Sequence, residues 1–449
     1  MAKSLVYTSS DISLKNINRL AIPAIITGIA EPILSITDTA IVGNVPVNAT
    51  EALAAVGIAG SFISAIIWIL AQTRTAISAT IAKYLGAKKL RHVLKLPSQI
   101  IFFNLILSLI IYGLTSYFAY TIFGWYNAKG VVLDQAVSYY KIRALGYPLT
   151  LFAFAIFGVF RGMQNTFWPM VISIVGVILN IALDLILVFG IDTLIEPMHV
   201  EGAAWASVIA QAVMALMALV LFIKKTPFSF KIEGKFHPEI PTIVSLSFNL
   251  FLRTLFLNIA LYFANAYATK YGNQYIAAQT IAFQIWLFFA FFIDGYSSVG
   301  NIMSGKLLGE EDFFSMKKLS IRLNKVALVI SVFLIVVCAI FYQKIGVVFS
   351  KEEAVLSSFK DVFWIVLLMQ PINVIAFIFD GIFKGLSEAS ILRNLLAAAT
   401  FFGFIPSLLL GDYLGWKLYG IWFAFFVWML IRGGVLIIIF KRKYLAKIT

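Results

Sequence analysis

The chain has 449 residues, of which 61% are apolar and only 12% are charged. This composition excludes an ordinary soluble domain, and the mean hydropathy of +0.94 agrees with that exclusion. The net charge of +14 does not require a nucleic-acid partner, because most Lys and Arg residues fall in short segments between apolar stretches.

Apolar windows of about 20 residues recur along the whole chain, and each is long enough to cross a hydrocarbon core of roughly 30 Å. We therefore predict an all-α integral membrane protein with about twelve transmembrane helices in the lipid bilayer. In chain order they lie near residues 16–42, 54–81, 97–123, 132–160, 168–190, 202–223, 241–269, 277–305, 322–343, 353–382, 392–411 and 418–440.

Basic residues are distributed unequally between the two sides of these helices. With the N-terminus inside, the cytoplasmic segments hold 24 of the 35 Lys and Arg residues, and the opposite segments hold eight, among them Lys141 and Arg143. The excess of positive charge on one side predicts a multi-pass protein of the inner (plasma) membrane with both termini in the cytoplasm.

The sequence repeats with an offset of 223 residues. Residues 53–89 align without a gap on residues 276–312, and the FRG triplet at 160–162 aligns on the FKG triplet at 383–385. Six spans in each half is an even number, so both halves start on the same side of the membrane. The repeats are then parallel, related by a pseudo-two-fold axis along the membrane normal.

Two six-helix bundles are therefore expected, an N-terminal lobe at residues 1–223 and a C-terminal lobe at residues 242–449. The basic, proline-containing segment 224–241 is polar enough to lie at the cytoplasmic surface as a linker. Two bundles of this kind can rock around a central site, which favours a transporter that works by alternating access.

Ionisable side chains inside apolar windows cost about 2.5 kcal/mol or more each, so they indicate function unless a partner is present. In the first predicted helix, Asp38 and Glu31 lie on nearly the same face. Pro23 removes a backbone hydrogen bond in the same helix and favours a bend. We expect this helix to couple cation binding to a change of shape. The alternative is an Asp38 that only caps or pairs near the interface.

In the fifth predicted helix, Asn180 and Asp184 are one turn apart. A carboxylate with a neighbouring amide offers oxygen ligands for a proton or Na⁺, although a polar contact between helices would use the same residues. The equivalent positions of the second half hold Gly403 and Ser407. Cation coupling is therefore predicted in the first half, with no cofactor besides the coupling ion, which is H⁺ or, alternatively, Na⁺.

Other polar groups fall in the predicted spans of the second half. Asp380 and Lys384 are four residues apart near a helix end, which predicts a structural ion pair. Arg253 has no partner in the sequence, and Asp294 is expected either to pair with it or to line the substrate cavity, where Arg253 is also a candidate. Aromatic candidates for the wall of that cavity are Tyr139, Phe154, Trp286 and Phe288.

Metal and enzyme chemistry are not expected. Cys338 is the only cysteine, and the three His residues are scattered through predicted loops, which leaves no cluster of metal ligands. No arrangement of a nucleophile and a base suggests a membrane enzyme either.

Several longer segments are familiar in combination. These are LAIPAIITGIAEPILSITDTAIVG, the turns KYLGAKK and KLLGEED, and the segments FRGMQNTFWP and NIALDLILVFG. Together they resemble the multidrug and toxic compound extrusion (MATE) family over essentially the whole chain. An acidic residue in the first helix with an Asn/Asp pair in the fifth is similar to the DinF branch of that family.

The resemblance implies cation-coupled export of drugs and other organic compounds, often cationic and amphipathic, for which a monomer is sufficient. By motif position it places Asp38, Asn180 and Asp184 in the coupling cluster and adds Ser207. It also makes Pro23 the point at which the first helix bends. Glu31 matches no position of the family, so its role rests on its place in the helix alone.

Other functions remain as alternatives. A lipid-linked oligosaccharide flippase of the same superfamily would need several cations in the cleft, and only Arg74 and Arg253 are expected to lie deep. An organic-anion exporter would use the same scaffold for another substrate. A major-facilitator transporter shares the six-plus-six layout, but its Gly-x-x-x-Asp-Arg-type loop is absent between the second and third predicted helices.

Overall fold

The computed structural model of the protein describes residues 10–46, 48–191, 194–230 and 235–448. These residues form two compact units. Unit 1 consists of residues 26–85 and 89–244, and unit 2 of residues 10–25, 86–88 and 245–448.

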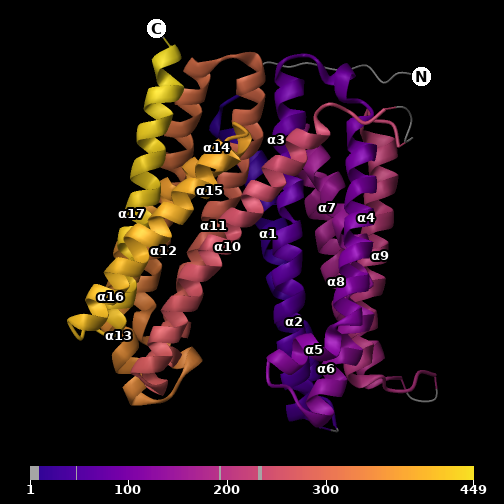
Figure 1. Cartoon of the computed structure of the whole chain (residues 1–449), viewed down its shortest axis with the longest axis vertical. Coiled ribbons are helices and arrows are strands. Elements are labelled where there is room, and N and C mark those ends of the chain that lie inside the picture. Colours follow the sequence, from indigo (N-terminus) through magenta and orange to yellow (C-terminus); the bar gives the residue numbers. More distant parts are fainter. Residues whose placement is uncertain (1–9, 47, 192–193, 231–234, 449) are drawn as a thin grey trace. The chain divides into compact units, whose positions relative to one another are not determined.

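Helices account for almost all of the described chain (Figure 1). Up to the predicted linker they are α1 (Leu14–Val42), α2 (Ala49–Leu70), α3 (Gln72–Gly86), the short η1 (Leu90–Val93), α4 (Leu96–Tyr117), α5 (Ala119–Trp125), α6 (Gly130–Arg143), α7 (Gly146–Gly162), α8 (Phe167–Phe189) and α9 (His199–Lys225). After it they are α10 (Ile240–Tyr271), α11 (Asn273–Glu310), α12 (Phe313–Phe349), α13 (Glu353–Leu368), α14 (Gln370–Gly385), α15 (Ala389–Ala398), the π-helical η2 (Ala399–Phe404), α16 (Ile405–Tyr413), α17 (Leu418–Lys443) and η3 (Leu445–Lys447). Within the predicted linker, residues 231–234 lie outside the described residues.

Among the described residues, ten helical stretches are long and apolar enough to cross a membrane, and two bent pairs raise the number to twelve if each pair is one span. The pair α6 and α7 is bent by 43°, and the pair α13 and α14 by 51°. Each bend comes just before a proline, Pro148 or Pro371. Proline has no backbone N–H group to donate, and its ring clashes with the carbonyl group of the preceding turn, so the helix is interrupted there. The prediction of an all-α protein with about twelve spans is confirmed.

The sequence repeat is visible in the packing within each unit. A Cβ atom on Gly158 of α7 would lie 2.7 Å from the carbonyl oxygen of Arg74 on α3. In unit 2, a Cβ atom on Gly381 of α14 would lie 2.1 Å from the carbonyl oxygen of Ser297 on α11. Both members of these two pairs differ by the offset of 223 residues. Two helices therefore touch backbone to backbone at the same place in both units, which glycine allows.

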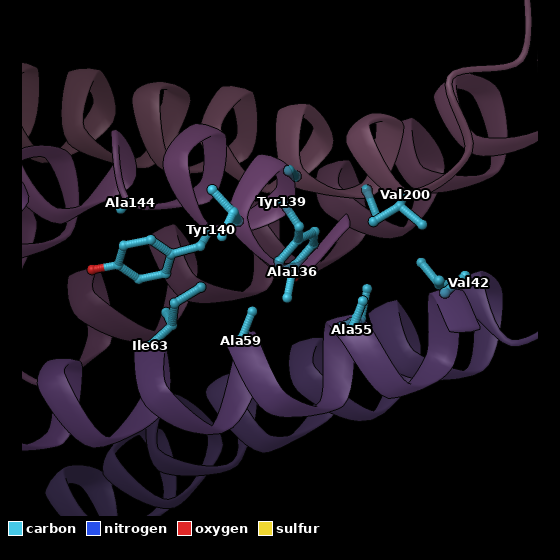
Figure 2. Close-up of a cluster of buried hydrophobic side chains, with 14 of the residues drawn as sticks. Val42, Ala55, Ala59, Ile63, Ala136, Tyr139, Tyr140, Ala144 and Val200 are labelled. Carbon is cyan, nitrogen blue, oxygen red and sulfur yellow. The ribbon is translucent and has the colours of Figure 1, made fainter. Parts of the chain in front are cut away.

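Small side chains let α2 and α6 pack closely in unit 1. Figure 2 shows Ala59 and Ile63 of α2 facing Ala136 and Tyr140 of α6 within a buried apolar cluster. Tight packing of this kind fixes the position of a helix, because closely packed side chains leave no space into which the helix could shift. It therefore fixes α6, whose last residue is Arg143.

α8 and α9 run antiparallel, side by side, and glycine sets their separation (Figure 1). A Cβ atom on Gly176 of α8 would lie 2.2 Å from Sδ of Met214. A Cβ atom on Gly202 of α9 would lie 2.5 Å from the carbonyl oxygen of Leu187. Polar residues of the two helices meet between these two contacts.

In unit 2, α14 packs against α11, α12 and α17. Gly433 allows α17 to approach closely, since a Cβ atom there would lie 3.3 Å from Cγ2 of Ile375 on α14. Because neighbouring helices cover α14 on several sides, its polar residue Asp380 is buried.

α1 is shared between the units, with residues up to Ile25 in unit 2 and residues from Ile26 in unit 1. Its first part is tied to unit 2, where the hydroxyl of Tyr296 donates a hydrogen bond to Asn18 Oδ1 at 3.0 Å. Pro23 is buried and lies two residues before the change of unit. The predicted bend point therefore lies next to the place where this helix passes from one unit to the other.

Candidate cation-coupling site

Four polar side chains from three helices meet in the interior of unit 1. Asp38 of α1, Asn180 and Asp184 of α8, and Ser207 of α9 each expose 4% or less of their surface. Asn180 Nδ2 donates a hydrogen bond to Ser207 Oγ at 3.1 Å, and Ser207 Oγ donates one to Asp38 Oδ2 at 3.1 Å. The structure thus brings together residues that are 169 positions apart in the sequence.

This cluster holds more acceptors than donors. Asp38 Oδ1, Asn180 Oδ1 and both carboxyl oxygens of Asp184 accept no hydrogen bond from the described residues. Buried acceptors without donors are unfavourable unless a proton or a cation satisfies them. The two carboxyl groups also act electrostatically on each other, and a proton on one of them would remove their mutual repulsion.

A buried arginine accompanies the two carboxyl groups. Arg143 is 6% exposed and acts electrostatically on both Asp38 and Asp184. Tyr139, one turn earlier on α6, is 2% exposed and interacts with Arg143 and with both acidic groups. One arginine balances one of two carboxylates, so the cluster lacks one positive charge when both are ionised.

Sequence reasoning missed Arg143, because it counted this residue only among the basic residues on the side opposite the cytoplasm. In the structure Arg143 is the last residue of α6, just before the bend, and its side chain is buried. The spacing of Tyr139 and Arg143, four residues apart on one helix face, is the signal that could have found it.

The other candidates from the sequence lie in different surroundings. The ring of Phe154 on α7 lies under the guanidinium of Arg74, at 4.8 Å. In unit 2, Trp286 is 6% exposed whereas Phe288 is 47% exposed, so these two side chains do not share one environment. The side chain of Glu31 lies outside the described residues.

Arg253 is paired in the structure, although the sequence offered no obvious partner. Its Nη2 atom lies 2.7 Å from Asp380 Oδ1, while the side chain of Asp294 is exposed. The alternative in which Asp294 pairs with Arg253 is therefore wrong, since Asp294 is exposed whereas Arg253 is buried beside Asp380. The predicted ion pair of Asp380 and Lys384 is confirmed, with a distance of 2.7 Å between Nζ and Oδ2.

The donor set of the cluster in unit 1 consists of oxygen atoms only, from two carboxyl groups, one amide and one hydroxyl. Such a set suits a proton or a hard monovalent cation such as Na⁺ rather than a transition metal. Among the described residues, no group of three or more His, Cys, Asp or Glu side chains has the arrangement of a metal site.

The sequence matches the MatE family over residues 23–186 and again over residues 246–409. The two matches cover more than half of the chain and are separated by the offset of the internal repeat. The chain belongs to the MatE family. MatE proteins are membrane transporters and not enzymes, so the predicted class is confirmed.

Several relatives agree with this assignment. The chain is 26% identical to DNA damage-inducible protein F of Escherichia coli, over 97% of the chain and 93% of the relative, as the similarity to the DinF branch predicts. It is 27% identical to Protein DETOXIFICATION 42 of Arabidopsis thaliana over 66% of the chain, and it spans only 56% of that relative. It is 24% identical to Multidrug export protein MepA of Staphylococcus saprophyticus, over 69% of the chain and 68% of the relative.

Solved structures of MATE proteins share the fold. One, described as a MATE in the bent conformation, is similar with a TM-score of 0.89 over 96% of this chain and 95% of the other. The two sequences are 20% identical, so this likeness concerns the fold of the MatE protein described here.

Proposed function

We propose that this MatE protein exports organic compounds in exchange for protons across the inner membrane, with both termini in the cytoplasm. The coupling site is the cluster of Asp38, Asn180, Asp184 and Ser207. Na⁺ is the alternative coupling ion, because the same oxygen atoms can hold it. Export of organic compounds is supported by the similarity to a protein described as a multidrug export protein.

One observation carries the proposal. The cluster is buried, it contains four oxygen atoms without a hydrogen-bond donor among the described residues, and Arg143 balances only one of its two carboxyl groups. A single proton shared between Asp38 and Asp184 supplies both the missing charge and a missing hydrogen bond. Binding of that proton would then balance the charge of the cluster and complete a hydrogen bond, and its release would undo both.

α1 connects the cluster in unit 1 to unit 2 through a single helix. Asp38 lies on the part of α1 that belongs to unit 1, and the other end of the same helix belongs to unit 2. In the proposed mechanism, loading of the proton changes the contacts of Asp38 and α1 responds near Pro23, where a backbone hydrogen bond is missing. One charge that moves through 100 mV supplies about 2.3 kcal/mol to drive export.

Transport in proteoliposomes with imposed gradients tests this function. The wild type is expected to expel a fluorescent organic compound when a pH gradient is applied, and not when a Na⁺ gradient is applied at equal pH. Asp38→Asn and Asp184→Asn should each lose gradient-driven export, because an amide cannot release a proton. Asp134→Asn is the matched control, since Asp134 is an exposed carboxylate on α6 of the same unit.

Two results would contradict the proposal. Full gradient-driven export by both Asp38→Asn and Asp184→Asn would remove coupling from this cluster. Export driven by Na⁺ alone, and lost in the same two variants, would keep the site but replace the ion. Glu31→Gln belongs in the same series, because the role of Glu31 in coupling stays a prediction.

A further inference from the structure

Unit 2 holds a second buried cluster of charged residues, in which positive charge is in excess. Asp380 on α14 lies among three cations, Arg253, Lys384 and Arg432. The exposed fractions are 3% for Asp380, 7% for Arg253 and 3% for Arg432. One carboxylate cannot balance three cations, and uncompensated charge inside a membrane protein marks a candidate ligand site.

The three cations are not held equally. Arg253 donates to Asp380 Oδ1 from Nε at 2.9 Å, and its Nη2 lies 2.7 Å from the same atom. Lys384 Nζ lies 2.7 Å from Oδ2, so both carboxyl oxygens are engaged. Arg432 Nη2 is 4.0 Å from Oδ1 and makes no hydrogen bond with a described residue. Arg432 is therefore the surplus cation.

Among the described residues, the contacts of Arg432 do not supply the missing acceptor. Its guanidinium lies 4.8 Å from the ring centre of Trp428 and 5.7 Å from that of Phe377, and Nη1 contacts Sδ of Met429 at 3.1 Å. Aromatic faces and a thioether are weak partners compared with a carboxylate. Asp380 is the carboxylate that acts on Arg432.

A second buried donor nearby also lacks an acceptor. Trp286 Nε1 makes no hydrogen bond with the described residues. The Trp286 ring lies 6.1 Å from Phe377, the same ring that contacts Arg432, and is stacked with Phe425 at 6.3 Å. Two buried donors without acceptors beside aromatic rings suit a flat molecule that carries a negative charge.

We propose that this cluster binds the carboxylate of a flat organic anion that the protein transports. Arg432 Nη2 donates to the carboxylate, and the rings of Phe377, Trp428 and Trp286 contact the apolar part. The inference rests on the proposed export function and names its substrate class, which is anionic rather than cationic. Because Arg432 is buried in this conformation, the ligand enters in another state of the transport cycle.

Equilibrium binding of radiolabelled 2-naphthoate to the full-length protein in detergent tests the inference. Saturable binding is expected, and unlabelled 2-naphthoate should compete whereas the uncharged 2-naphthamide should not. Arg432→Gln should weaken binding about tenfold, and Arg432→Lys should restore part of it, since Lys keeps the charge but loses the planar fork. Lys270→Gln is the control, because Lys270 is an exposed cation of unit 2 paired with Asp412.

Asp380→Asn separates a binding role from a structural one. Removal of the competing carboxylate should tighten 2-naphthoate binding. If the cluster has only a structural role, Asp380→Asn should instead unfold the protein, and 2-naphthoate binding is lost with the fold. Thermal unfolding distinguishes the two results.

Three outcomes would overturn the inference. The first is unchanged 2-naphthoate binding by folded Arg432→Gln or Arg432→Lys. The second is equal competition by 2-naphthamide. The third is stronger competition by farnesyl diphosphate than by 2-naphthoate, which would assign the site to a lipid-linked pyrophosphate. These assays use no gradient, so intact 2-naphthoate binding without gradient-driven export would contradict the coupling proposal alone.

Discussion

Ser207 Oγ donates a hydrogen bond to Asp38 Oδ2 at 3.1 Å and accepts one from Asn180 Nδ2 at the same distance. A single hydroxyl group therefore connects α9 to both α1 and α8. Because this bond ends on the carboxyl group of Asp38, a change in the protonation of Asp38 would alter a contact of α9. The first prediction concerns this hydroxyl.

Ser207→Ala should reduce gradient-driven export about fivefold, because a buried hydrogen bond contributes about 1 kcal/mol. Ser207→Thr keeps the hydroxyl and should retain most of the activity. Initial rates of efflux from proteoliposomes measure the effect. Ser61→Ala is the control, since the exposed Ser61 hydroxyl donates only to the backbone of its own helix. Equal rates for Ser207→Ala and the wild type would exclude a role of this hydroxyl in coupling.

Gly202→Ala should destabilise the protein by about 1–3 kcal/mol, because the added Cβ atom would lie 2.5 Å from the carbonyl oxygen of Leu187 and force α8 and α9 apart. Thermal unfolding in detergent measures the change. At Gly57 of α2, no described residue outside the adjoining helix backbone has an atom within 4 Å of the added Cβ atom, so Gly57→Ala should leave the Tm unchanged or slightly higher. A Tm for Gly202→Ala that equals that of Gly57→Ala would show that the two helices do not pack as described.

Arg143→Gln should lower the Tm, because it removes the buried cation beside Asp38 and Asp184. Addition of Asp184→Asn should recover part of the loss, since fewer negative charges then need compensation. A double-mutant cycle on thermal unfolding gives the coupling between the two positions. Lys141→Gln, an exposed cation on the same helix, serves as the control. Additive effects of Arg143→Gln and Asp184→Asn would mean that the two side chains do not interact.

The sequence alone finds the two carboxyl groups that the structure places in one buried cluster. Asp38 and Asp184 are found because ionised groups in apolar windows are rare enough to indicate function. The fold follows from the same windows and from the repeat, whose offset recurs in the glycine contacts of Gly158 and Gly381. Ser207 is found only through the family resemblance, because one serine in a predicted span carries no signal of its own.

The buried arginines were missed for a physical reason. Arg143 and Arg432 both fall inside predicted spans, at residues 132–160 and 418–440, but the sequence shows no acidic partner for either residue. Their burial depends on a bent span in one case and on the packing of α17 against α14 in the other. Neither can be read from periodicity, because both depend on which helices become neighbours.

Proton release on substrate binding tests the central claim most directly. A compound that the proteoliposome assay shows to be exported is added to purified protein in weakly buffered detergent solution, and the change in pH is recorded. The wild type should release about one proton per chain, whereas Asp38→Asn and Asp184→Asn should release none, because the shared proton is absent. Release of the same amount by both variants, or no release by a wild type that binds the compound, would contradict the account.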